Sequence, residues 1–331
     1  MNHFVYYMKN RSIIISIVLV LVLALLWYLN SESNNYNQSE KFQVGLVYLV
    51  KHPAIDQAIE GFKEELKNDT VFNIEYANAF GEVKNVNTIV NGFKQKDLDL
   101  IVALTTPCAQ ISEQMVDNIP IVFVGVSDPV EAGLVKDLNN GFENVTGTTS
   151  KDPNYETLEL AKKLFPEMKR VGVLYSSSEA NSVSILENID NKIAANSLDV
   201  EIIKKSVTNT IEILPALNSM INDLDAIFLI NDNTIISSLD LMLNTASDNE
   251  IPIFASDIES VNKGALFTYG LNYKDEGVAA AQIMKRILVE NKKPSEIPIY
   301  INSKYYLHVN KSLLNYDIDS NIIDKAKVVG E

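Results

Sequence analysis

A six-residue run, DLDLIV at residues 97–102, decides the fold of this chain because it returns in nearly the same form as DLDAIF at residues 223–228. A second run, IPI at residues 119–121, is repeated as IPI at residues 251–253. The two repeats come in the same order, and each contains an apolar segment of strand length. They therefore indicate two lobes built on one plan of strands and helices.

Around these repeats, short apolar runs alternate with longer amphipathic stretches, which is typical of a parallel β-sheet covered by helices. We expect strands at residues 43–49, 72–77, 100–104, 121–124, 170–175, 200–204, 226–230, 252–255 and 265–269. We expect helices at residues 54–67, 82–94, 155–164, 181–196 and 275–290. The fold class predicted by this alternation is α/β.

The two lobes are expected to be discontinuous in sequence. The polar segment NVTGTTS at residues 144–150 is predicted to cross from the first lobe to the second, and residues 269–271 are predicted to return. Because a long helix follows the return, we expect that helix to pack on the first lobe. The prediction assigns residues 42–147 and about 270–298 to lobe 1, and residues 148–269 and about 299–331 to lobe 2.

Composition and charge exclude several classes of protein. The 331 residues include 28 Lys and Arg against 43 Asp and Glu, for a net charge of −15. A phosphate backbone would repel such a chain, so no nucleic-acid partner is expected. The single cysteine, Cys108, cannot form an internal disulfide, and His3, His52 and His308 lie too far apart to suggest a metal site. We expect no metal and no cofactor.

An apolar run at residues 13–29 predicts attachment to a membrane. Lys9 and Arg11 precede the run, so the positive-inside rule places the N-terminus in the cytoplasm and the binding domain on the extracellular side of the cell membrane. A cleavable signal peptide stays an alternative, although no small-x-small cleavage pattern follows the run. The prediction is a cytoplasmic segment at 1–11, a single-pass transmembrane signal anchor at 12–29 and a polar tether at 30–41.

Five motifs stand at or beside the expected strand ends: HPA at 52–54, TTPCAQ at 105–110, IPIVFVGVSDPV at 119–130, NVTG at 144–147 and NDNT at 231–234. Together they resemble the solute-binding proteins of ABC importers, in particular the subfamily whose known members bind aromatic amino acids such as tryptophan and tyrosine. The resemblance implies a type I periplasmic-binding-protein fold, with two Rossmann-like lobes joined by a multi-strand hinge.

The resemblance also implies a function. The chain would capture an amino acid, aromatic by analogy with the subfamily, and deliver it to an ABC permease with its ATPase. Members from Gram-positive bacteria usually carry a lipobox cysteine, which is absent here and leaves the apolar run as the expected anchor. A ligand-binding sensory ectodomain that signals to a partner membrane protein stays open as an alternative, with a small-solute hydrolase as a weaker third. The G-x-G-x-x-G, P-loop and G-x-S-x-G patterns are absent from the sequence, so no enzyme is expected.

Ligands of open α/β sheets lie beyond the carboxyl ends of the strands, so the polar and aromatic residues there are the candidates for ligand binding. They are Tyr48, His52, Thr105, Thr106 and Asp128 in the first half, and Ser176, Ser178, Asn231, Asp232, Asp257 and Tyr269 in the second. Other aromatic residues near strand ends, Tyr273 among them, are candidate walls for an aromatic ligand or ordinary core residues.

Each polar candidate has a structural alternative. Thr105 and Thr106 begin a helix whose free N–H groups either bind a carboxylate or are simply capped. Asp128 and Asp257 are candidate partners of a ligand ammonium, or caps of the following turn. His52 is expected to donate to a carboxylate or to be a surface residue.

Two local expectations accompany the candidates. The segment SSSE at 176–179 fits a capping box, in which Ser and Glu cap the start of a helix. Cys108 is expected to be a small buried residue rather than a reactive thiol.

Overall fold

The computed structural model divides into two units, residues 1–41 and residues 42–331. The anchor predicted at 12–29 and the tether predicted at 30–41 lie almost entirely outside the described residues, so both stay predictions. Within the described part of the chain, no helix is both long and apolar enough to cross a membrane. The described residues are 22–24, 41–151, 153–312 and 326–329.

The first lobe contains a six-stranded sheet in the order β11-β5-β4-β3-β1-β2. Every neighbouring pair in this sheet is parallel. A parallel order of this kind needs helical crossovers, which the amphipathic stretches between the strands supply. The strands are β1 (Phe42–Tyr48), β2 (Phe72–Asn78), β3 (Leu100–Leu104), β4 (Ile121–Val124), β5 (Val145–Ser150) and β11 (Tyr300–Asn302).

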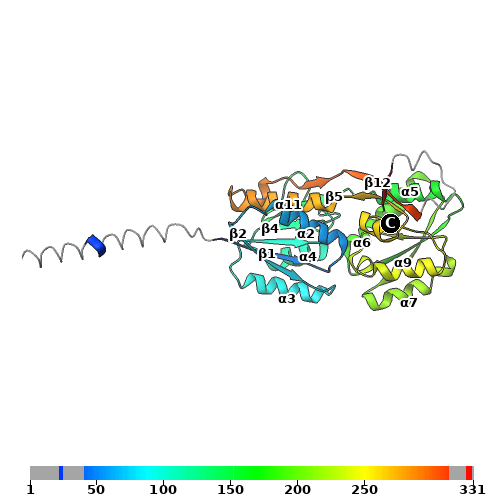
Figure 1. The fold of residues 1–331 in the computed structure, drawn as a ribbon, viewed down its shortest axis with the longest axis horizontal. Helices are drawn as coiled ribbons and strands as arrows, with labels where there is room; N and C mark the ends of the chain where they lie inside the picture. The colour runs from blue at the N-terminus through cyan, green and yellow to red at the C-terminus, as the bar shows by residue number, and fades with distance from the viewer. Residues whose placement is uncertain (1–21, 25–40, 152, 313–325, 330–331) are drawn as a thin grey trace, which may run out of the picture. The chain divides into compact units, whose positions relative to one another are not determined.

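Helices cover both faces of this sheet (Figure 1). Helices α2 (Pro53–Glu65) and α11 (Tyr273–Leu288) pack on one face, and α3 (Val83–Lys94) and α4 (Thr106–Met115) pack on the other. Helix α11 follows the second lobe in sequence yet shares the core of the first. Gly277 permits this close packing, because a Cβ atom there would lie 1.8 Å from the carbonyl oxygen of Ala58 on α2.

The second lobe repeats this plan around a four-stranded parallel sheet in the order β7-β6-β8-β9. Its strands are β6 (Arg170–Ser176), β7 (Glu201–Val207), β8 (Ala226–Leu229) and β9 (Ile253–Ala255). Its longer helices are α5 (Asn154–Leu164), α6 (Ala180–Asn196) and α9 (Leu239–Asp248), and its shorter ones are α7 (Ile213–Asn218), α8 (Asn233–Ile236) and α10 (Ile258–Lys263). Single turns of 3-10 helix occur at Thr210–Glu212, Ile221–Asp223 and Pro294–Glu296.

A three-stranded sheet of order β10-β12-β13 adjoins the second lobe. Phe267, Leu307 and Val309 of its strands belong to the apolar core formed with α5 and α6. The polypeptide passes between the lobes after β5, after β10 and after β11, and these three crossings form the hinge. The strands are β10 (Phe267–Leu271), β12 (Tyr305–Asn310) and β13 (Lys327–Val329).

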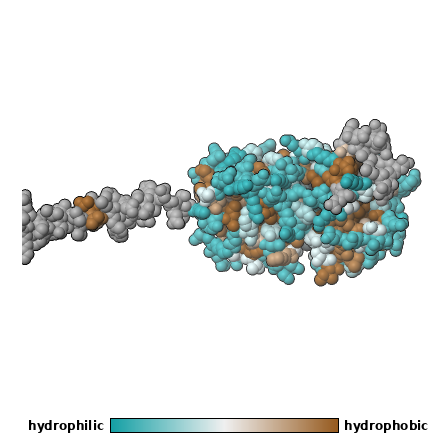
Figure 2. Space-filling view, viewed as in Figure 1, coloured by the Kyte–Doolittle hydropathy of each residue, from teal (hydrophilic) through white to brown (hydrophobic). Residues whose placement is uncertain are grey.

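The predicted α/β fold of two parallel-sheet lobes is confirmed, with two differences at the hinge. Residues 145–150, expected to be a polar crossing, form the buried strand β5, because their backbone pairs with β4 and β11 and their hydroxyl-bearing side chains are covered. Residues 300–302 join this first sheet through β11, whereas residues from about 299 onward were expected in lobe 2. Hydrophilic residues cover most of the described part of the face shown in Figure 2.

Candidate ligand-binding site

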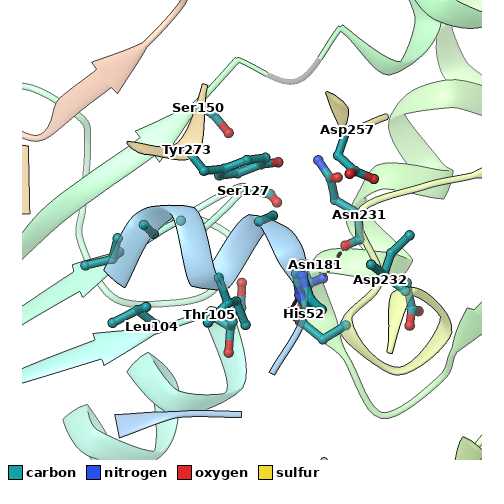
Figure 3. Close-up of a pocket in the computed structure, with 18 residues that line it drawn as sticks. His52, Leu104, Thr105, Ser127, Ser150, Asn181, Asn231, Asp232, Asp257 and Tyr273 are labelled. Atoms are coloured by element: carbon teal, nitrogen blue, oxygen red, sulfur yellow. Dashed lines mark hydrogen bonds between the residues drawn. The ribbon is translucent and has the colours of Figure 1, made fainter. Parts of the chain in front are cut away.

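A cavity lies between the two lobes, at the carboxyl ends of the strands (Figure 3). It contains about 630 Å³ of empty space, including its open mouth. One part of its lining is apolar and is formed mainly by the first turns of α2 and by the ends of β3 and β4. The apolar residues are Ala54, Ile55, Ala58, Leu104, Val124 and Ile236.

Four buried polar atoms on the lining have no hydrogen-bond partner among the described residues. They are Nδ1 of His52, Oγ1 of Thr105, Oδ1 of Asn181 and Nδ2 of Asn231. A buried polar group without a partner costs about 1–3 kcal/mol, so folded proteins rarely leave several together. Their convergence on one cavity is the arrangement expected of groups that bind a polar ligand.

Thr105 has an unusual backbone conformation at the start of α4. Its φ of 82° and ψ of 155° lie in a region that side-chain-bearing residues rarely adopt. Such a conformation costs of order 1–3 kcal/mol and is found at functional sites more often than elsewhere. The side chain is buried at the cavity and makes no capping hydrogen bond to its own helix.

The tautomer of His52 follows from a chain of hydrogen bonds across the cleft. The Asn233 amide nitrogen donates to the Glu179 carboxylate over 2.6 Å, which leaves the amide oxygen of Asn233 to accept from Nε2 of His52 over 3.3 Å. Burial lowers the pKa of His52, so its ring is neutral. Nδ1 is then an acceptor. The expected donation from His52 to a ligand carboxylate is therefore wrong for this ring nitrogen.

Three buried carboxylates, those of Glu179, Asp232 and Asp257, lie on the lobe 2 side of the cleft. Asp232 and Asp257 cap helices α8 and α10, accepting from the backbone N–H groups of Ile235 and Ser260. Burial, reinforced by the nearby Glu179, raises the pKa of Asp232 to about 7. Burial also raises the pKa of Asp257.

The structure brings six of the sequence-predicted residues to this cavity and places five elsewhere. Those on the lining are His52, Thr105, Thr106, Asn231, Asp232 and Asp257. Tyr48 packs against the core under α2, and Tyr269 packs in the second core with an edge-to-face contact to Tyr305. The remaining residues outside the lining are Asp128, Ser176 and Ser178.

Asp128 serves as a turn cap, because its Oδ1 accepts from the backbone N–H groups of Val130 and Glu131. It faces a second cavity, of about 1000 Å³ including open solvent, that Lys151 and Lys192 also line. The following turn thus takes up Oδ1 of one of the two aspartates named as candidate partners of a ligand ammonium.

The expected capping box is wrong. Helix α6 begins at Ala180 rather than directly after Ser176, and the Ser176 hydroxyl instead pairs with that of Ser178 over 2.8 Å. The Glu179 carboxylate turns toward α8, where it accepts from the backbone and side chain of Asn233 and of Thr234. Through these hydrogen bonds, the buried carboxylate of Glu179 fixes the position of the first residues of α8.

Asn181, Ser150 and Tyr273 line the cavity but were not among the predicted site residues. Asn181 lies on the first turn of α6 and Ser150 ends a strand taken for a crossing segment, so neither stood at a predicted strand end. Tyr273 had been named as one of several aromatic candidates. Cys108 is buried beside the site, and burial raises its pKa to about 12, which accords with an unreactive thiol.

Within the described residues, hydrogen bonds join the lobes directly. Besides the His52–Asn233 contact, Gln57 on α2 donates to Glu259 on α10, and Ser184 on α6 donates to Glu131 over 2.6 Å. The lobes are thus closed over the cavity.

A two-lobed α/β fold with a polar and apolar cavity in its cleft defines a binding protein of the periplasmic-binding-protein type. The chain belongs to the ABC transporter substrate binding protein family, whose model it matches over residues 43–326. The family is one of solute-binding proteins, which confirms the expectation that the chain is not an enzyme.

Individual proteins are similar to this chain in sequence and in structure over most of its length. The chain is 32% identical to a tyrosine-binding protein from Clostridioides difficile strain R20291 over 312 residues, covering 91% of this chain and 90% of the relative. It also superposes on the crystal structure of an ABC domain from Streptococcus pneumonia in complex with L-Trp. That match has a TM-score of 0.82 and 29% identity, covering 88% of this chain and all of the other.

A third comparison bears on the position of the lobes. The ligand-free, open structure of a Clostridium difficile substrate binding protein with adhesive properties is also 29% identical, and the match covers 87% of this chain and 99% of the other. Its TM-score is only 0.63. Since identity and coverage are nearly equal in the two structural matches, the lower TM-score reflects a difference in backbone arrangement between this chain and the open structure.

Proposed function

We propose that this protein captures an aromatic amino acid between its lobes. The observation that carries the proposal is the convergence of unpaired polar atoms beside an apolar wall in one cavity. An amino acid presents an ammonium donor and a carboxylate acceptor on one carbon, with its side chain to one side. The polar atoms fit the first two groups, and the wall formed by Ala54, Ile55 and Ala58 fits the third.

Two relatives support an aromatic side chain. The Clostridioides difficile relative is a tyrosine-binding protein, and the Streptococcus pneumonia structure contains L-Trp. The small residues Ala54, Ala58 and Gly125 leave room for a flat ring next to Leu104 and Tyr273.

The proposal extends to transport. The protein hands its ligand to an ABC permease with its ATPase, and the segment at residues 12–29 holds it at the extracellular face of the cell membrane. Family membership supports the first part, and the apolar run after Lys9 and Arg11 supports the second. The mass of the mature protein tests the anchor, because an uncleaved anchor retains residues 1–29 and a cleaved signal peptide removes them.

Thermal unfolding in the presence of single amino acids tests ligand capture. A ligand at 100 times its dissociation constant stabilises the folded protein by about 2.7 kcal/mol. We expect a rise in Tm with L-tryptophan or L-tyrosine and none with L-aspartate or L-lysine. No rise with any aromatic amino acid would refute the proposed ligand.

Asn181→Leu serves as a matched variant in the same assay. The substitution removes an acceptor with no protein partner, and with it the amide nitrogen's hydrogen bonds to the Asn231 carbonyl over 3.0 Å and to the Ser182 hydroxyl over 3.4 Å. The variant is expected to fold and to show a smaller ligand-induced rise in Tm than the wild type.

A further inference from the structure

His52 is held from the opposite lobe by a relay of two residues. It precedes α2 in lobe 1, and its Nε2 lies 3.3 Å from the amide oxygen of Asn233, the first residue of α8 in lobe 2. Glu179 holds that amide, because its Oε2 accepts from the backbone N–H of Asn233 over 3.2 Å and from its amide nitrogen over 2.6 Å. A carboxylate can only accept, so the amide of Asn233 is left to present its oxygen to His52.

This relay admits one state of the ring. An amide oxygen accepts a hydrogen, so Nε2 of His52 carries a proton. The residue as a whole is half-buried, but its Nδ1 is buried and forms no hydrogen bond with any described residue. A second proton on Nδ1 would make a cation without a protein acceptor, which is costlier to bury than the neutral ring. The closed cleft therefore favours the neutral ring with its proton on Nε2.

Three carboxylates face His52 and attract a proton to it. They belong to Asp56 on its own helix, Glu179 before α6 and Asp257 before α10. Donors of lobe 2 already occupy Glu179 and Asp257, and burial of the ring outweighs their attraction, so the pKa of His52 is lowered. Asp232 also lines the cavity, with both oxygens occupied by backbone N–H groups of lobe 2. No Lys or Arg of the described residues lines it.

The relay belongs to lobe 2, so it acts on His52 only while the lobes are together. Among the described residues, Asn233 is the one hydrogen-bond partner of the ring, and lobe 1 supplies none. Apart from lobe 2, the ring titrates with an ordinary histidine pKa of about 6.5 and is a cation below that pH. Closure of the lobes and protonation of His52 therefore exclude each other.

Resting on the proposed function, we propose that closure over the ligand removes the proton of His52 and passes it to solvent, with Asn233 and Glu179 as the positioning residues that impose the neutral ring. Because the closed state binds fewer protons than the open state, closure becomes less favourable as pH falls. Acidification then shifts the population toward open lobes and releases the ligand.

Calorimetry with L-tryptophan or L-tyrosine, whichever binds more tightly, measures this proton. Titrations in buffers that differ in ionisation enthalpy give the number of protons released for each ligand bound. A ligand-free ring with a pKa of about 6.5 predicts release of about 0.8 proton at about pH 6 and about 0.1 at about pH 7.5. The affinity should fall about tenfold between about pH 7.5 and about pH 5.5.

His52→Gln is the matched variant for the pH profile. Its amide nitrogen keeps a donor for Asn233, but the side chain takes up no proton in this range. The variant should lose most of the proton release and most of the fall in affinity. Asp232, whose pKa is about 7, titrates in the same range in both proteins, so the difference between the two profiles isolates His52.

Nitrogen NMR of the protein labelled with ¹⁵N-histidine tests the relay itself. At about pH 6, below the ordinary histidine pKa, His52 of the ligand complex should be neutral with its proton on Nε2. His308 is an internal reference for the opposite tautomer, because its Nδ1 lies 2.9 Å from the carbonyl oxygen of Tyr306 and must carry the proton. The signals of His52 are those lost in His52→Gln.

Two alanine variants separate the relay from a general effect on α8. Asn233→Ala removes the amide oxygen, so His52 should exchange between its two neutral tautomers in the complex. Thr234→Ala removes a different partner of the same Glu179 carboxylate, a hydroxyl that donates over 2.8 Å, and should leave the proton of His52 on Nε2.

Two results would overturn the proton link while leaving the proposed function standing, because the ligand is bound in both. In one, His52 of the wild-type complex is protonated on both nitrogens or carries its proton on Nδ1. In the other, the wild type and His52→Gln have the same pH profile of affinity. Failure of the wild type to bind any aromatic amino acid at about pH 7.5 would instead refute the proposed function and the proton link with it. Melting curves of each ligand-free variant verify that it is folded.

Discussion

Replacement of Thr105 by glycine should make the ligand-free protein more stable and its ligand weaker. Thr105 combines two costs in the ligand-free state: a backbone conformation that only glycine adopts without strain, and a buried hydroxyl with no partner. Glycine removes both. The prediction is unusual because the substitution deletes buried atoms, a change that ordinarily destabilises a protein.

The magnitude follows from four contributions. Relief of the strain contributes about 1–3 kcal/mol, and removal of the unpaired hydroxyl about 1–3 kcal/mol. Loss of the buried methyl group costs about 0.8 kcal/mol, and the greater freedom of glycine in the unfolded chain costs about 0.5–1 kcal/mol. With middle values, Thr105→Gly stabilises the ligand-free protein by about 2 kcal/mol.

Thermal unfolding measures this gain. An unfolding entropy of about 2.1 cal/mol/K per residue, applied to the unit at residues 42–331, converts about 2 kcal/mol into a rise in Tm of about 3 °C. Thr106→Gly is the matched control, because Thr106 is also buried at the cavity but lies in the helix without a positive φ. The control should lose about 1 kcal/mol.

Binding should change in the opposite direction. Without the Thr105 hydroxyl, a polar group of the ligand loses a hydrogen bond in the cavity, which weakens binding by about tenfold. If Thr105→Gly lowers Tm as much as Thr106→Gly does, the reasoning from strain and an unpaired hydroxyl is refuted.

Three further substitutions test other parts of the structure. Because the pKa of Asp232 is raised to about 7, its ionisation destabilises the folded protein as pH rises from about 4 to about 7, by up to about 4 kcal/mol. Denaturant titrations between pH 5 and pH 8 should therefore show that Asp232→Asn gains stability relative to the wild type. A stability difference between the two that is constant with pH would contradict this. Gln57→Ala removes the hydrogen bond to Glu259 that joins the lobes, so calorimetry should show L-tryptophan binding a few-fold more weakly, with the Tm of the ligand-free protein unchanged. Equal affinity of the variant and the wild type would show that this hydrogen bond does not favour closure of the lobes. Gly277→Ala should lower the free energy of unfolding by at least about 2 kcal/mol, because its Cβ would overlap α2. Gly92→Ala, with open space around it, should be neutral or slightly stabilising. Equal Tm values for the two variants would contradict the close helix packing.

The sequence was sufficient for the fold because the fold depends on patterns that are local and repeated. The apolar strands at 100–104 and 121–124 have the predicted bounds, since buried parallel strands are continuous apolar runs. Strand β5 was missed because its residues, VTGTTS, are mostly polar although all are buried. This segment forms a strand because it pairs with β4 and β11, one on each side. No local sequence pattern indicates such pairing.

The site was predicted less completely because side-chain direction depends on tertiary contacts. Asp128 and Asp257 both follow a strand and precede a turn, and both cap that turn, yet only Asp257 lines the cavity. Asn181 begins the helix predicted at 181–196, but it does not stand at a predicted strand end. The role of His52 as an acceptor depends on Asn233, which is 181 residues away in sequence.

A crystal structure of the protein grown with L-tryptophan or L-tyrosine, whichever raises Tm more, tests the central claim most directly. We predict one ligand molecule in the cavity, with its ring on the apolar wall of α2 and its charged groups within hydrogen-bond distance of the unpaired polar atoms of His52, Thr105, Asn181 and Asn231. An empty cavity, or a ligand bound instead in the second cavity beside Asp128 and Lys192, would contradict the claim.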